Sequence, residues 1–295
     1  MHSLLLLDIF RLQDFDGPPG SLPRSPASRP GPTQRQRRPS IHGPPPSLYY
    51  QPPQTQLLRL KGNEVSALTT AVVEGNAGIV EQFLQRGLDP DFVPPGPTGE
   101  SLLMMAASKQ QAYIVQLLLN YHASVYKKDK QGYPAIVHVL FQAGDTDVTE
   151  VLRQLLEANA DTNILVGNLS PLTIAVSQGN AEAVKLFLEH GASPNYPEVG
   201  VRPIMVASVR KDPIKLMELL LSYGADVDAQ TKEGDTALMI LLDSQDSNRH
   251  RIGPSVASFL VDTAGANVQI RNEAGKSARD IAIANGWSSD VISLL

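Results

Sequence analysis

The sequence of 295 residues contains no cysteine, and aromatic residues make up only 5% of it. The absence of cysteine excludes a disulfide framework, a thiolate nucleophile and a cysteine-ligated zinc site. Few aromatic residues beside 42% hydrophobic residues favour an aliphatic helical protein over a sandwich or a barrel.

Long apolar runs are also missing. The segment Leu4–Leu7 is too short to span a bilayer, and it lacks the basic start and small-residue cleavage site of a signal peptide. We therefore expect no membrane insertion and an intracellular protein, cytoplasmic or nuclear, that is not secreted.

Motifs of catalysis are absent too. The six histidines are dispersed along the sequence, and we interpret none of them as part of a zinc or general-base site. No glycine-rich phosphate loop, Gly-x-Ser-x-Gly elbow or kinase motif set occurs. The sequence predicts no enzyme activity, no catalytic residue, no cofactor and no metal.

Acidic residues are missing between Asp16 and Glu64, where the composition changes. Twelve of the 23 prolines lie between Pro18 and Pro53, together with five arginines. Such a segment has too few apolar residues to offset its chain entropy. We predict that residues 1–58 form a disordered, basic, proline-rich arm. Ser40, which follows Arg37-Arg38-Pro39, resembles a site for arginine-directed kinases and is a candidate for phosphorylation.

The rest of the chain repeats one phrase about every 33 residues. Its clearest copy begins with Ser170-Pro171-Leu172-Thr173-Ile174-Ala175 and ends with Gly191-Ala192. A fixed period of this kind indicates a solenoid. The copies align on a position that is alanine in five of seven cases: Ala71, Ala106, Val139, Ala175, Ala207, Leu241 and Ala282.

Each element of the phrase has a physical reason. The initial Ser or Thr suits a helix N-cap, and Pro171 or Pro203 suits a first helical turn. Apolar pairs such as Ile114-Val115 and Leu118-Leu119 give the second helix one apolar stripe. Gly87, Gly191, Gly224 and Gly265 stand where this helix ends in a left-handed residue, and His122 and Asn159 replace glycine there.

These residues resemble the ankyrin repeat. The resemblance implies an all-α solenoid of helix-turn-helix units with β-hairpin fingers, which covers residues 59–295. Stacking of neighbouring units supplies the core. The expected repeats are residues 60–92, 93–127, 128–164, 165–196, 197–230, 231–270 and 271–295. The sixth carries a polar insertion from Asp243 to Gly253, which we expect to form a loop.

Charge limits the partners of this array. Residues 59–295 carry 19 basic and 27 acidic side chains, a net charge of −8. Because phosphate neutralisation requires clustered Lys and Arg, we expect no nucleic acid as a partner. We expect a monomer that binds protein.

The resemblance further implies that partners lie in a concave groove formed by the fingers and the first helices. The aromatic residues Phe141 and Tyr196 are the strongest candidates for binding, because aromatic anchors beside arginine are typical of hot spots. Packing against the next unit is the alternative for Phe141. The full set of candidates is Met105, Lys109, Lys127, Lys128, Phe141, Gln142, Gln178, Tyr196 and Arg210.

One modification follows from the resemblance alone. Ankyrin fingers are substrates of an asparaginyl hydroxylase, and Asn163, with Leu156 and Asp161 before it, partly fits that pattern. Thr162 departs from it, because an aliphatic residue is preferred there.

The sequence predicts a non-enzymatic scaffold or adaptor that binds a protein partner through the groove of the repeat array. The alternative is a regulatory or targeting subunit of an enzyme complex, with the N-terminal arm as a docking segment controlled by phosphorylation.

Overall fold

The computed structural model describes residues 59–141, 147–198, 200–210, 212–244 and 249–295. For residues 249 and 250 it describes the backbone alone. The predicted disordered arm with Ser40 and the candidate Gln142 lie outside the described residues. No helix in the described part of the chain combines the length and apolar character needed to cross a membrane.

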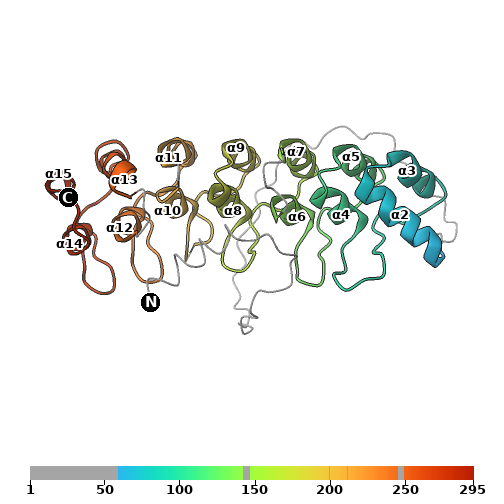
Figure 1. The fold of residues 1–295 in the computed structure, drawn as a ribbon, viewed down its shortest axis with the longest axis horizontal. Helices are drawn as coiled ribbons and strands as arrows, with labels where there is room; N and C mark the ends of the chain where they lie inside the picture. Colours follow the sequence, from blue (N-terminus) through green and yellow to red (C-terminus); the bar gives the residue numbers. More distant parts are fainter. Residues whose placement is uncertain (1–58, 142–146, 199, 211, 245–248) are drawn as a thin grey trace, which may run out of the picture.

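The described residues form paired helices stacked in one direction, so that the molecule is elongated (Figure 1). The first helices of the pairs make one row and the second helices make the other. The first helices are α2 (Gly62–Glu74), α4 (Leu102–Ser108), α6 (Ala135–Phe141), α8 (Pro171–Gln178), α10 (Pro203–Ala207), α12 (Ala237–Asp243) and α14 (Ala278–Ala284). The second helices are α3 (Ala77–Gln85), α5 (Ala112–Asn120), α7 (Thr149–Glu157), α9 (Ala181–Glu189), α11 (Pro213–Ser222), α13 (Arg249–Ser258), which continues into the π-helical turn η1 (Phe259–Thr263), and α15 (Ser289–Leu294).

The core runs along the molecule between the two rows. Every one of the seven aligned positions lies in the first helix of a pair, and none is more than 3% exposed. The second helices contribute their apolar stripe, as Ile114, Val115 and Leu118 do in α5. Small side chains in most of the first helices let neighbouring pairs approach closely, so the core is continuous through the stack.

Helix ends follow the sequence signals. Ser170 caps α8 by accepting the backbone N–H of Thr173 (3.1 Å), and Pro171 occupies the first turn. His122 and Asn159 adopt the left-handed conformation, with φ of 65° and 61°, as predicted. Their backbone N–H groups close the ends of α5 and α7 onto the carbonyls of Leu119 and Leu156.

Two details differ from expectation. Ser66 stands at the capping position of the repeat phrase but lies inside α2, which begins at Gly62. In this first pair the helix starts one turn earlier, and Glu64 accepts the backbone N–H of Lys61 (3.0 Å) instead. The insertion from Asp243 to Gly253 is not all loop, because α13 already begins at Arg249.

Successive fingers, the connections between one helix pair and the next, are joined by a ladder of side-chain hydrogen bonds. An Asp or Asn after one second helix accepts a backbone N–H from the corresponding turn of the next repeat. The bonds join Asp91 to Ser124 (2.8 Å), Asn163 to Ser193 (2.9 Å), Asn195 to Asp226 (2.8 Å) and Asp228 to Asn267 (2.8 Å). At the corresponding finger position Tyr126 stands instead, and its hydroxyl donates to the Asn159 carbonyl (2.9 Å). The ladder fixes the spacing of the fingers.

Candidate protein-binding surface

The candidate surface is formed by the first helices and the fingers, which lie on the same side of the molecule (Figure 1). We call it the first-helix face. Its finger hairpins are short, and isolated bridges join Lys128 to Pro134, Val166 to Leu169 and Arg271 to Ser277. Most side chains of the first helices are buried, so exposure on this face is concentrated in finger residues and helix ends.

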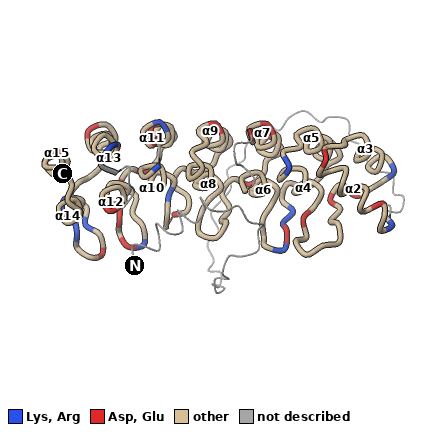
Figure 2. Tube along the Cα trace, viewed as in Figure 1, with Lys and Arg blue, Asp and Glu red and all other residues tan. Residues whose placement is uncertain are grey.

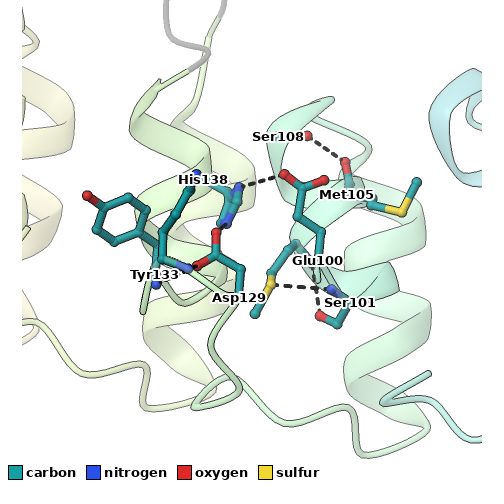
Figure 3. Close-up of polar contacts among 9 residues, drawn as sticks. Glu100, Ser101, Met105, Ser108, Asp129, Tyr133 and His138 are labelled. Atoms are coloured by element: carbon teal, nitrogen blue, oxygen red, sulfur yellow. Dashed lines mark hydrogen bonds and ion pairs between the residues drawn. The ribbon is translucent and has the colours of Figure 1, made fainter. Parts of the chain in front are cut away.

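The finger before α6 is built around Asp129, whose side chain is fully buried. Its Oδ1 accepts the backbone N–H groups of Gln131 (2.8 Å) and Tyr133 (2.9 Å), which close the hairpin. The Nε2 of His138 lies 3.1 Å from Asp129 Oδ2, and its Nδ1 lies 3.8 Å from Glu100 Oε1 in the preceding finger (Figure 3). His138 thus links two adjacent fingers from inside the core.

The sequence pattern missed this contact of His138. Asp129 is nine residues before it and Glu100 is in another finger, so neither shows helical spacing. Tyr133 in the same finger is also partly buried. Desolvation and the negative charge of Asp129 raise the pKa of its hydroxyl.

Three lysines project from this finger. The Nζ atoms of Lys127 and Lys130 donate to the carbonyls of Asp91 (2.6 Å) and Gly96 (2.9 Å), while Lys128 is exposed. Lys130 was not predicted as a binding residue, although its neighbours were. Figure 2 shows this basic stretch on the loop below α4 and α6.

The aromatic candidate Phe141 closes α6. It is half-buried, and its ring meets the ring of Tyr133 edge to face, with centroids 5.6 Å apart. Met105 of α4 is also half-buried against the core, and Lys109 at the end of α4 is exposed. The structure therefore places these four side chains on two helix pairs that contact each other.

The remaining candidates lie further along the array. Gln178 ends α8 and donates its Nε2 to the Leu140 carbonyl (2.6 Å), so this amide is used to close α6. Tyr196 is half-buried in the finger before α10, and Arg210 is half-buried after α10. Gln178 thus contacts α6 directly, whereas Tyr196 and Arg210 are separated from the α4–α6 group by the α8–α9 pair.

Asn163 is exposed at a finger and makes two contacts with the next repeat. Its Oδ1 accepts the N–H of Ser193 (2.9 Å), and its Nδ2 donates to the Gly191 carbonyl (3.4 Å). Asn195 makes the same pair of contacts one repeat later, with Asp226 and Gly224. The polar atoms of both side chains are thus engaged in the ladder.

Metal ligation has no support within the described ranges, where no group of three or more His, Asp or Glu side chains could hold an ion. Two exposed apolar finger residues, Tyr126 (61% exposed) and Leu165 (50%), are not among the predicted binding residues. Tyr126 replaces the Asn of the ladder, and this departure from the repeat pattern is the signal that could have identified it.

Comparison with known proteins agrees with this geometry. The family model described as "Ankyrin repeats (3 copies)" matches residues 68–165, 103–198 and 140–231, which together cover more than half of the chain. The chain belongs to the ankyrin-repeat family. The chain is similar to the crystal structure of the ankyrin repeat domain of Bcl-3, described as a unique member of the IkappaB protein family. The two structures superpose with a TM-score of 0.61 and share 26% sequence identity, and the match covers 77% of this chain and 96% of that one. The human ASB11 ankyrin repeat domain has a TM-score of 0.60 at 24% identity, over 77% of this chain and 95% of that one, and supports the fold alone.

Curated relatives of this ankyrin-repeat protein are much longer than the matched region. The human "SH3 and multiple ankyrin repeat domains protein 2" is 31% identical over 212 residues, which is 70% of this chain and 11% of that protein. The mouse "B-cell lymphoma 3 protein homolog" is 29% identical over 127 residues, 42% of this chain and 28% of that protein. The chain therefore spans a small part of these relatives.

Proposed function

We propose that this ankyrin-repeat protein is a non-enzymatic, intracellular scaffold or adaptor that binds a protein partner through the first-helix face. Ankyrin repeat domains generally mediate protein–protein interaction, and the chain belongs to that family. A stacked core gives a rigid surface, so little ordering entropy opposes binding.

The observation that carries the proposal is the contrast within the first helices. Their middle residues are packed in the core, while the finger and helix-end side chains of repeats two and three extend toward solvent. Lys109 and Lys128 are exposed, and Met105 and Phe141 are half-buried. Half-buried apolar side chains bordered by charges are typical of a hot spot with a polar rim.

Affinity purification from cells, followed by mass spectrometry, tests this function. Wild type is compared with Phe141→Ala/Tyr196→Ala and with a chain that lacks residues 1–58, after circular dichroism shows each to be folded. Loss of one reproducible partner in the double variant alone supports recognition by the first-helix face. A partner lost only in the truncated chain contradicts it.

That second outcome would favour the alternative of a regulatory or targeting subunit. The specific observation for it is the run Arg37-Arg38-Pro39 before Ser40. A stoichiometric enzyme that co-purifies with the full chain, and is released by Ser40→Asp, would support docking through the arm.

Hydroxylation of Asn163 remains a proposal about the same fingers. Mass spectrometry of the chain from cells should show one added oxygen on the Asn163 peptide and not on an Asn163→Ala chain. Absence of that oxygen in repeated preparations excludes the modification.

A further inference from the structure

We infer that the first-helix face of repeats two and three takes an acidic segment of the partner, with an aromatic or aliphatic side chain beside its carboxylates. This inference rests on the protein-binding role proposed above and names the chemistry of the partner.

Charge is segregated along the array. Residues 101–144 contain four lysines and a single acid, Asp129, and Glu100 just before them is turned toward His138, whereas residues 59–295 as a whole carry a net charge of −8. The lysines are Lys109, Lys127, Lys128 and Lys130. They lie at the end of α4 and on the finger before α6, so this basic stretch of an acidic array coincides with the first-helix face (Figure 2).

The acid of this stretch does not neutralise the lysines. Asp129 points into the core, where it is held by His138 and by two backbone N–H groups (Figure 3). Among the described residues, these four lysines form no ion pair with a carboxylate, although other surface pairs occur, such as Lys185 with Glu189. Lys127 and Lys130 donate to neutral carbonyls and keep their charge, because each ammonium has three N–H donors.

The same two helix pairs also carry an apolar component. Phe141 and Tyr133 stack edge to face, and Met105 is half-buried in the neighbouring helix. An acidic peptide in extended conformation would place alternate side chains on lysines and on this apolar group.

The chain's own arm does not fit this surface. Its five arginines between residues 17 and 58, without one acid, would be repelled by the lysines. Charge complementarity therefore points to a separate acidic partner.

Fluorescence anisotropy with the full chain tests the inference. The probe is a labelled peptide of alternating glutamate and phenylalanine, and its reference is the same peptide with glutamine in place of glutamate. We expect the glutamate peptide to bind about tenfold more tightly or better, and the difference to shrink at high salt.

A matched pair of variants locates the binding. Lys109→Glu/Lys128→Glu should weaken binding of the glutamate peptide about tenfold or more, while Lys232→Glu/Lys276→Glu should leave it within about twofold. All four lysines are surface residues, and both variants change the net charge equally. Equal loss in both variants, no preference for glutamate, or tighter binding of single-stranded RNA than of the peptide overturns the inference.

The outcome also separates the two proposals. If the glutamate peptide fails to bind but Phe141→Ala/Tyr196→Ala still loses its cellular partner, the acidic chemistry is wrong and the binding face stands. If neither the peptide nor a cellular partner depends on this face, both proposals fail.

Discussion

The indole N–H of Trp287 donates a hydrogen bond of 2.8 Å to the carbonyl of Leu242. The bond joins the last helix pair to the end of α12, and the Asn285 amide reaches the same carbonyl (3.1 Å). Trp287 is the only tryptophan of the sequence, and it is 4% exposed. Its fluorescence therefore reports on the junction of the last two repeats.

Gly253 should not tolerate a side chain at this junction. A Cβ at Gly253 would overlap the Trp287 ring atoms Cη2 and Cζ3. We expect Gly253→Ala to lower the free energy of unfolding by about 1–3 kcal/mol, because overpacking displaces the ring. Urea titration followed by Trp287 fluorescence measures the change.

Gly78 provides the matched control. It also lies in a helix, but a Cβ there would meet only Asn76 Oδ1 at 3.8 Å. Gly78→Ala should stabilise the chain by about 0.5–1 kcal/mol. Equal effects at the two glycines would contradict the close approach of Trp287.

Ser170 and Ser66 occupy the same place in the repeat phrase but should respond differently to alanine. Ser170 caps α8, so Ser170→Ala is expected to destabilise by about 1 kcal/mol. Ser66 lies inside α2 and donates to the Gly62 carbonyl (3.1 Å), so Ser66→Ala should change stability by less than about 0.5 kcal/mol. Chemical denaturation of the two variants distinguishes them; a loss at Ser66 as large as at Ser170 would place the start of α2 wrongly.

The hydroxyl of Tyr126 should contribute to the stability of the fold. Tyr126→Phe removes the bond to the Asn159 carbonyl and should lower the free energy of unfolding by about 0.5–1.5 kcal/mol. Tyr113 is 71% exposed, and Tyr113→Phe serves as the control, with no change expected. Parallel urea titrations decide the point, and identical curves for the two variants would argue against a structural bond at Tyr126.

Asp280 should make the free energy of unfolding depend on pH in the acidic range. The backbone N–H of Ser277 holds the pKa of Asp280 below its ordinary value of 3.8, with help from the Ser277 hydroxyl and Arg271. The lowered pKa means that this contribution is present above pH 3.8 and is lost as the pH falls through the pKa in the folded chain.

The carboxyl resonance of Asp280 in NMR titration measures this pKa directly. In Ser277→Ala it should rise toward the ordinary value, since one hydrogen bond is removed. An unchanged pKa in that variant would mean that the Ser277 hydroxyl does not hold the carboxylate.

The repeated sequence pattern predicted the fold because it reflects local structural requirements. Small residues such as Ala106 and Ala175 are favoured where two helix pairs meet, and left-handed residues such as His122 are favoured where a second helix ends. These requirements recur in each repeat, so the sequence repeats with the same period as the stacked helix pairs.

Features that depend on neighbours were not predictable in the same way. The contacts of His138 come from two fingers and follow from stacking, not from sequence spacing. Within the insertion, Gly253 of α13 packs on Trp287 of the next helix pair, a contact that no sequence spacing predicts. Ser66 is not a cap because α2 begins at Gly62, one turn before it.

For the binding surface, the sequence proposed Met105, Lys109, Lys128 and Phe141, which lie in or next to the adjacent helices α4 and α6. It did not identify Tyr133 or Lys130, since their relation to Phe141 and to the preceding finger is tertiary. Binding of a protein partner by these residues is the central proposal.

Site-specific photo-crosslinking in cells tests that proposal most directly. A photoreactive phenylalanine analogue is placed at Phe141 or Lys128 on the first-helix face, and at Tyr113 on a second helix as the exposed control. We predict one partner crosslinked from Phe141 and Lys128 and none from Tyr113. Crosslinking from Tyr113 alone, or equally from all three positions, would contradict binding by the first-helix face.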